Sequence, residues 1–199
     1  MGRKTFVSSP LTHGSDNLNI LAIDQARNGA WSVFDYEKKE LLGYGTFSFE
    51  EGKYTYPRAI LHIEQLVHLL IKAWDIRAVF IEDINLRQNV FAYKRLAQLQ
   101  GVLVNLFEKH EFLYGCIAPS QWQNYCKARG RNSTEVKKQV LELDAGDKRA
   151  SKILSIQFVK EQFGIETDND NLADAVCIGH FIVNEVKING KEIIVPKKK

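Results

Sequence analysis

Acidic side chains stand at three places where an apolar segment of this chain begins or ends. Asp24 closes the run 20–23, Glu82 closes the run 79–81, and a third acidic stretch, 168–174, leads into an apolar segment. Continuous apolar runs predict strands buried on both faces, where a carboxylate is costly unless something neutralises it. If folding brings the three places together, their oxygens form a ligand set suited to hard divalent cations such as Mg²⁺.

Each acid also has an ordinary structural interpretation. An Asp that closes a strand is commonly a turn or cap residue, and the acids of 168–174 fit a polar loop that caps the next helix. Glu82 is harder to explain in this way, because glutamate is disfavoured in strands. All three places are boundaries between a buried element and its successor, where α/β sites are built, and their combination favours a metal site.

Composition indicates a single compact domain. The chain has 199 residues, of which 45% are hydrophobic and 26% charged. We expect a loose N-terminal arm at 1–17, one domain at 18–188 and a tail at 189–199. No apolar run is long enough to span a bilayer and the first 16 residues lack a signal-peptide core, which together predict a cytoplasmic protein without membrane association.

Cysteines and charge narrow the class further. The three cysteines, Cys116, Cys126 and Cys177, are odd in number and lack CxxC spacing, so we expect reduced core thiols. The formal net charge is +3. Cations bound to the acid cluster would leave the rest of the surface more positive, which favours a polyanionic partner.

The apolar patterns predict an α/β domain with a five-stranded mixed sheet, three antiparallel strands followed by parallel ones, flanked by helices. The expected strands are 19–26, 30–35, 41–49, 77–84 and 113–118. The expected helices are 57–74, 91–109, 120–128 with Ser120 as its cap, 135–143, 151–163 and 172–186. A turn at 189–190 is expected to lead into a terminal strand at 192–195.

This order of elements, together with the acids, resembles the ribonuclease H-like superfamily and, within it, the RuvC-type Holliday junction resolvases of bacteria and their phages. The resemblance covers about residues 19–186. Asp24 corresponds to the family's first-strand Asp and Glu82 to its fourth-strand Glu. The run Ala118-Pro119-Ser120-Gln121-Trp122 matches the Pro-Ser-x-Trp after the fifth strand, and 168–175 matches the closing acidic stretch with Ala-Asp-Ala.

Two positions depart from the family pattern. Ala26 stands where many relatives have Gly, which is a small change in bulk. Asn171 stands three residues before Asp174, where relatives often have an acid. Residues three or four apart share one face of a helix, so either Asp170 or Asn171 can lie beside Asp174. Asp170 is our choice for the fourth acid.

The resemblance implies a Mg²⁺-dependent endonuclease that resolves four-way DNA junctions by paired symmetric nicks, leaving 5′-phosphate and 3′-hydroxyl ends. It implies that the cell is bacterial or a phage-infected host. It also implies a symmetric homodimer, and the surfaces of helices 60–74 and 91–107 are candidates for the dimer contact. Two Mg²⁺ ions, with Mn²⁺ as an expected substitute, would be bound by the catalytic acids Asp24, Glu82, Asp170 and Asp174. Asp24 would bridge both ions.

Other functions fit the same motifs. A ribonuclease that acts on RNA–DNA hybrids, or a nuclease for other branched DNA, would share the fold and the metal site. A non-catalytic DNA-binding module could use the same scaffold without the chemistry, although the presence of all three acid positions disfavours it.

Basic residues near the expected site are candidates for DNA contacts. The residues expected to bind phosphate are Lys127, Arg129, Arg131, Lys137 and Lys138, and the same segment also fits a solvated basic loop. Lys148, Arg149 and Lys152 form a second basic set. Phe91 can stack on an unpaired base, or it can begin the apolar stripe of its helix.

Overall fold

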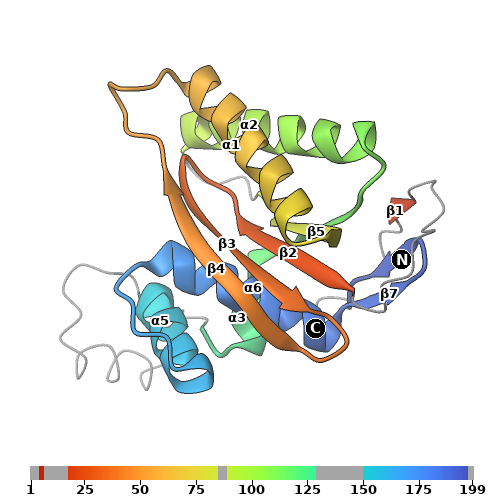
Figure 1. Cartoon of the computed structure of the whole chain (residues 1–199). Coiled ribbons are helices and arrows are strands. Elements are labelled where there is room, and N and C mark those ends of the chain that lie inside the picture. The colour runs from red at the N-terminus through yellow and green to blue at the C-terminus, as the bar shows by residue number, and fades with distance from the viewer. Residues whose placement is uncertain (1–4, 7–17, 85–88, 129–149, 197–199) are drawn as a thin grey trace.

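A computed structural model of the chain describes residues 5–6, 18–84, 89–128 and 150–196. Its main feature is a five-stranded sheet in the order β4-β3-β2-β5-β6 (Figure 1). Neighbouring strands are antiparallel from β4 to β2 and parallel from β2 to β6. The expected mixed sheet is therefore confirmed. Its strands are β2 (Asn19–Asp24), β3 (Asn28–Asp35), β4 (Glu40–Ser48), β5 (Ile76–Glu82) and β6 (Leu113–Ile117).

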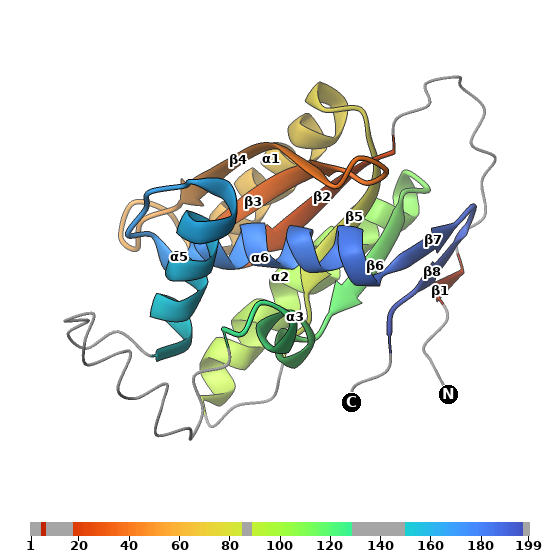
Figure 2. The same ribbon diagram turned by 90° about the horizontal axis from the view of Figure 1, so that it is seen from below.

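Helices cover both faces of this sheet. Figures 1 and 2 show α1 (Tyr56–Ala73) and α2 (Val90–Lys109) on one face. The other face carries α3 (Pro119–Tyr125), α5 (Ala150–Phe163) and α6 (Asp170–Glu185), with α6 running across the strands (Figure 2). The connections between the parallel strands β2, β5 and β6 run through helices, as parallel pairing requires.

The central strand β2 explains why its sequence is a continuous apolar run. Leu21 and Ile23 belong to the core under α1 and α2, whereas Ile20 and Ala22 belong to the core under α6. All four side chains are fully buried, because the strand has a helical layer on each side. Asp24, the last residue of this strand, can therefore reach solvent only at the end of the sheet where β2 stops.

The apolar stripes of the two long helices are mainly core. On α1, six residues are buried: Ala59, Ile60, Ile63, Val67, Leu70 and Ile71. The exposed large apolar side chains of this helix are Leu61 and Leu69. The stripes proposed as candidate dimer surfaces are thus mostly used inside the protomer.

A second, small sheet joins the two ends of the chain. It has the order β1-β8-β7 and consists of β1 (Thr5–Phe6), β7 (Lys187–Asn189) and β8 (Glu192–Ile194). Ile193 of β8 is buried in the core on the α6 side of the main sheet. Part of the expected arm and part of the expected tail therefore form strands.

The elements otherwise agree with the expected ones, and their ends match to within two residues, with one exception. The exception is α3, which ends at Tyr125 rather than Ala128. Ser120 is not its cap, which is a wrong prediction: Ala118 is the N-cap and Pro119 starts the helix. Proline suits this position because its fixed φ and missing N–H cost nothing in the first turn. The expected helix 135–143 lies outside the described residues.

The structure also bears on two expectations from composition. All three cysteines are unpaired in the structure, with Cys126 and Cys177 buried and Cys116 half-buried. Within the described ranges, no helix combines the length and apolarity needed to cross a bilayer.

Close packing of α6 on β3 depends on Gly179. A Cβ atom at this position would lie 2.4 Å from Cε2 of Phe34 and 2.7 Å from Oγ of Ser32. We predict that Gly179→Ala lowers the free energy of unfolding by about 1–3 kcal/mol, as expected for an overpacked core. Urea unfolding followed by circular dichroism measures the change.

Gly101→Ala provides the matched control. Gly101 lies in α2, and nothing lies within 4 Å of its Cβ position. Alanine there is expected to raise the free energy of unfolding by about 1 kcal/mol, because glycine is a poor helix former. Equal effects of the two substitutions would contradict the packing argument.

Candidate active site

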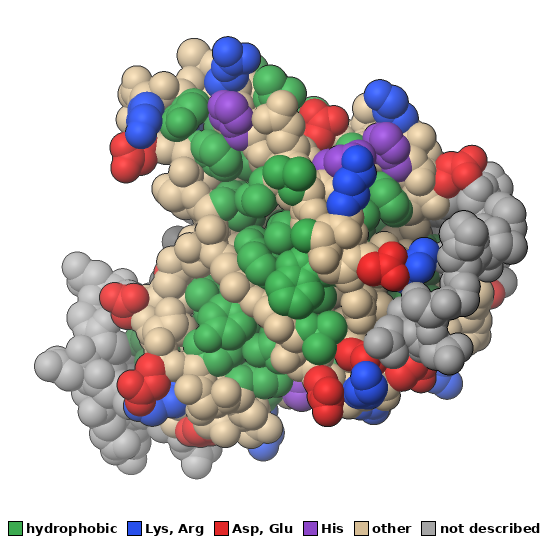
Figure 3. Space-filling model, viewed as in Figure 1, with side chains coloured by type: hydrophobic (Ala, Val, Ile, Leu, Met, Phe, Trp, Pro, Cys, Tyr) green, Lys and Arg blue, Asp and Glu red, His purple; other side chains and the backbone are tan. Residues whose placement is uncertain are grey.

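The predicted acids lie at one end of the sheet. Asp24 is the last residue of β2 and Glu82 the last residue of β5, and these two strands are adjacent and parallel. Helix α6 begins beside the start of β3, because the Asn171 side chain donates a hydrogen bond to the carbonyl of Asn28 at 3.0 Å. At this end of the sheet, the space-filling outline is indented between the β4–α1 connection and α5 (Figures 1 and 3).

Electrostatics show that the acids are close neighbours. Burial raises the pKa of Asp24 well above its usual value, and the charges of Glu82 and Asp174 raise it further. Asp170 adds a smaller effect in the same direction, while Lys152 opposes it. The structure thus brings together side chains that are separated by up to 150 positions in the sequence.

Lys152 of α5 is the cation of this cluster. Its Nζ forms an ion pair with Asp170 Oδ2 and lies 3.2 Å from Asp174 Oδ2. Burial lowers the pKa of Lys152, but the carboxylates of Asp174 and Asp170 outweigh this effect and the pKa is raised. Burial has the opposite effect on Asp174, because it raises the pKa of this carboxyl group, and the charge of Lys152 partly lowers it again. The ammonium group therefore partly offsets the repulsion among the acids.

Glu82 is oriented by Trp122. The indole Nε1 donates a hydrogen bond to Glu82 Oε1 at 2.9 Å, and the Trp122 side chain is almost completely buried. The position of Trp122 follows from Pro119, which starts α3 directly after β6. Glu82 also pairs with Ile117 of β6, so its backbone and its side chain are both fixed.

Asp170 and Asn171 make different contacts at the start of α6. Asn169 is the N-cap, and its side chain accepts a hydrogen bond from the Leu172 amide at 3.1 Å. Asp170 is then the first helical residue and shares Lys152 with Asp174. The Asn171 amide is instead used in the hydrogen bond to β3.

The donor set suits a hard divalent cation. All four acids offer carboxylate oxygens, the ligands that Mg²⁺ prefers. Asp174 Oδ1 is buried and accepts no hydrogen bond from the described part of the chain, so it can accept a cation. Across the described ranges, no three His, Cys, Asp or Glu side chains are already arranged as metal ligands.

The candidate DNA-binding residues are placed only in part. Lys127 is exposed directly after α3, whereas Arg129, Arg131, Lys137 and Lys138 lie outside the described residues. Phe91 is 64% exposed at the start of α2, so it does not begin the buried stripe of that helix.

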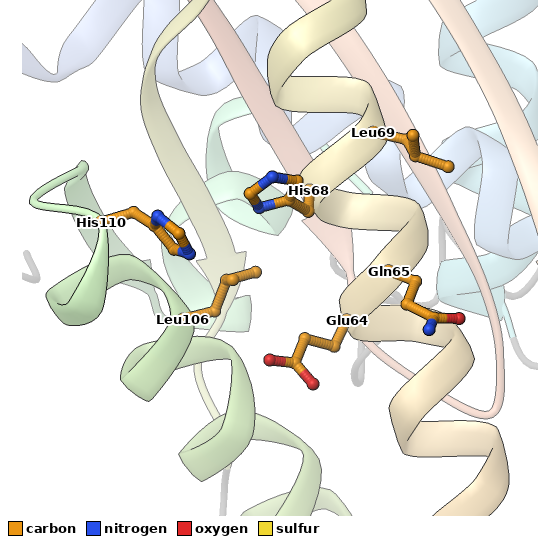
Figure 4. Close-up of a pocket in the computed structure, with 6 residues that line it drawn as sticks. All are labelled: Glu64, Gln65, His68, Leu69, Leu106 and His110. Atoms are coloured by element: carbon orange, nitrogen blue, oxygen red, sulfur yellow. The ribbon is translucent and has the colours of Figure 1, made fainter.

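A separate pocket of about 470 Å³ lies between α1 and α2 (Figure 4). Glu64, His68 and Leu69 of α1 line it, facing Leu106 and His110. The imidazole rings of His68 and His110 lie 5.0 Å apart. None of the four acids lines this pocket, so it is not part of the candidate active site.

Sequence reasoning missed the roles of two residues at the site. Lys152 was grouped with Lys148 and Arg149 as a basic set for DNA, and its contact with the acids depends on how α5 packs beside α6. Trp122 was noticed in the motif after β6, but without its hydrogen bond to Glu82. An acid at the end of a buried strand needs a hydrogen-bond donor. The sequence could therefore have indicated that Glu82 has such a partner, which the structure shows to be Trp122.

Comparisons with known proteins identify the fold. No protein-family model and no curated protein sequence matches the chain. Among solved structures, RuvC of T. thermophilus in complex with a Holliday junction substrate matches with a TM-score of 0.60 at 12% identity, covering 82% of this chain and 91% of that chain. T. thermophilus RuvC itself matches with a TM-score of 0.59 at 17% identity, covering 82% and 92%.

A eukaryotic protein has the same fold. The yeast mitochondrial Holliday junction resolvase Ydc2 matches with a TM-score of 0.51 at 12% identity, covering 82% of this chain and 77% of that chain. The chain therefore shares the fold of these RuvC and Ydc2 structures, which is the fold that its motifs predicted.

The raised pKa of Asp24 predicts a pH effect on stability. The folded, metal-free protein retains this proton to a higher pH than the unfolded chain does. The resulting stabilisation is complete below the unfolded pKa, near 3.8, and is lost as pH rises through the folded pKa. Asp24→Asn removes this loss, so in EDTA near pH 8 it is expected to raise the free energy of unfolding by about 0.5–2 kcal/mol.

Urea unfolding in EDTA across about pH 4 to pH 8 measures this difference. The control is Asp75→Asn, since Asp75 is exposed and lies outside the acid cluster. A lower stability of Asp24→Asn than of the wild type at pH 8 would contradict the prediction. In Mg²⁺, the wild type should gain more stability than the variant, because cation binding requires the carboxylate.

Proposed function

We propose that the protein is a Mg²⁺-dependent endonuclease that resolves four-way DNA junctions by paired symmetric nicks, leaving 5′-phosphate and 3′-hydroxyl ends. The observation that carries this proposal is the meeting of Asp24, Glu82, Asp170 and Asp174 at one end of a RuvC-type fold. The proposal is also supported by the structural likeness to proteins described as Holliday junction resolvases.

The four acids would hold two Mg²⁺ ions, with Mn²⁺ as a substitute. Bound there, the metal would lower the pKa of an attacking water and relieve charge on the scissile phosphate. Asp24 is proposed as the ligand that both ions would share, because the charges of Glu82, Asp174 and Asp170 all act on its carboxylate. Asp170 is favoured over Asn171 as the fourth ligand, because it shares Lys152 with Asp174.

The remaining side chains of the site would hold the ligands in place. Trp122 fixes the Oε1 atom of Glu82 by its hydrogen bond, so the carboxylate is held in one orientation. Lys152 keeps a positive charge beside Asp170 and Asp174, which also favours the approach of a DNA phosphate. The expected phosphate contacts beyond the site are Lys127, Arg129, Arg131, Lys137 and Lys138.

Phe91 is proposed to stack on a base at the junction centre. The Arg95 guanidinium lies 4.3 Å from the centroid of the Phe91 ring and 5.1 Å from that of Tyr56. Arg95 is itself held by an ion pair with Glu51 at 3.3 Å. An exposed aromatic ring supported in this way is preorganised for stacking, because little side-chain entropy remains to be lost.

Two active sites are needed to cut opposing strands of a junction, so we propose a symmetric homodimer. Nucleases for RNA–DNA hybrids or for other branched DNA would use the same acids, and the choice of substrate decides among them. A binding module without catalysis would have no use for a cluster of four acids, of which Asp24 and Asp174 are buried.

Glu82→Gln tests the proposed chemistry. The amide oxygen still accepts the Trp122 hydrogen bond, so the fold and junction binding should be retained, while nicking in Mg²⁺ should fall about 100-fold or more through loss of a ligand charge. A labelled four-way junction in a gel assay measures both binding and cleavage. Glu64→Gln, on α1 outside the acid cluster, is the control. Near-normal nicking by Glu82→Gln would refute the site.

The same assay with four-way, three-way, duplex and RNA–DNA hybrid substrates tests the substrate class. Paired symmetric nicks in the four-way junction, dependent on Mg²⁺, are expected. Equal cutting of the hybrid would instead favour the ribonuclease, and binding of junctions without any cutting by the wild type would favour the non-catalytic module.

Phe91→Ala tests the stacking role. Loss of one base–aromatic contact is expected to weaken junction binding by about 1–3 kcal/mol, with little change for linear duplex. Fluorescence anisotropy with both DNAs measures the difference. Tyr44→Ala is the control, since Tyr44 is an exposed aromatic residue on the edge strand β4. Equal weakening of duplex binding would contradict stacking at the junction centre.

A further inference from the structure

We propose that Gln25 is a positioning residue that ties the end of β2 to the end of β5 and thereby determines how tightly the acid cluster binds Mg²⁺. This inference rests on the proposed function for the identity of the metal. The role is distinct from that of a ligand, because Gln25 acts through the backbone of Glu82.

Backbone pairing between the two strands stops just before the acids. The last paired residues of β2 and β5 are Ile23 and Ile81, one position before Asp24 and Glu82. Beyond that point, the Gln25 side chain donates a hydrogen bond from Nε2 to the carbonyl of Glu82 at 2.7 Å. The Gln25 side chain therefore links β2 to β5 beyond the last backbone pair, next to Asp24 and Glu82.

The hydrogen bond from Gln25 to Glu82 matters because it lies between two strands that end in acids. Asp24 and Glu82 end adjacent parallel strands, so their carboxylates repel each other when both are ionised. Trp122 and Ile117 hold Glu82 on the side of β6. The Gln25 hydrogen bond holds it on the side of β2, where a metal ligand must be kept at a fixed separation from its partner.

The environment of Gln25 indicates more than a packing role. Its side chain is 4% exposed, and Oε1 accepts no hydrogen bond from the residues that the structure describes. A buried acceptor without a donor is unfavourable, and an apolar side chain of the same length would avoid that cost. What the glutamine supplies in return is the Nε2 donor to Glu82.

Gln25→Met tests the tie, because methionine has a similar length and no donor. Isothermal titration with Mg²⁺ in the absence of DNA should show about 10-fold weaker binding, the usual range for loss of a group that orients a metal ligand. The Mg²⁺ concentration for half-maximal junction nicking should rise by the same factor, while the rate at saturating Mg²⁺ stays near that of the wild type.

Gln25→Asn is the second variant, because its shorter side chain keeps the amide but cannot span the same distance. It should weaken Mg²⁺ binding to a similar extent, and it decides the question if the methionine variant does not fold. Gln100→Met is the matched control: Gln100 also has a buried Oε1 without a donor in the described part of the chain, but its Nε2 contacts Cys116 Sγ instead of the acid cluster.

Unchanged Mg²⁺ affinity in both Gln25 variants would overturn the proposal. So would an equal loss of affinity in Gln100→Met, which would indicate general loosening of the fold. If the wild type binds Mg²⁺ but cuts no junction, the proposed function fails, and the titrations still decide the role of Gln25. If the wild type binds no Mg²⁺ at all, both ideas fail together.

Discussion

Repulsion among carboxylates gathered at one end of the sheet is the constraint on which this structure depends. Burial and three neighbouring acids raise the pKa of Asp24 well above its usual value, so the ionised cluster opposes folding when no cation is present. Lys152 offsets part of this cost with an ammonium group shared between Asp170 and Asp174. A fold that retains such an arrangement sacrifices stability for a site, as functional sites commonly do.

The topology explains why distant parts of the sequence meet here. Parallel strands end at the same edge, so adjacent β2 and β5 deliver Asp24 and Glu82 together. Asp174 arrives from the other layer, and its position is set by how α6 packs on β3. That packing is fixed by the hydrogen bond from Ser32 Oγ to the Ala175 carbonyl at 2.7 Å. The geometry of the site is therefore a consequence of core packing as much as of the site residues themselves.

Sequence reasoning recovered the sheet and most helices because buried strands and amphipathic helices leave periodic apolar patterns. It also singled out acids that the structure brings to one end of the sheet, because Asp24 and Glu82 end apolar runs. It did not recover the contacts of Lys152 or Gln25, since neither residue differs in pattern from an ordinary surface lysine or turn glutamine. Phe91 had two interpretations that the pattern alone left open, and the structure leaves its side chain largely exposed. Tertiary placement of this kind leaves no periodic trace in the sequence.

Asp174 shows how the protein's own cation and a metal ion can use one cluster. Lys152 lies against Oδ2 of Asp174, while Oδ1 is buried without a donor in the described ranges. One oxygen is thus neutralised by the protein and the other is left for a ligand. Metal binding then does not require the ammonium to leave, and Lys152 can retain its charge beside the metal. If the proposed function holds, a scissile phosphate would approach four carboxylates, and the positive charge beside Asp170 and Asp174 would lower the electrostatic barrier to its entry.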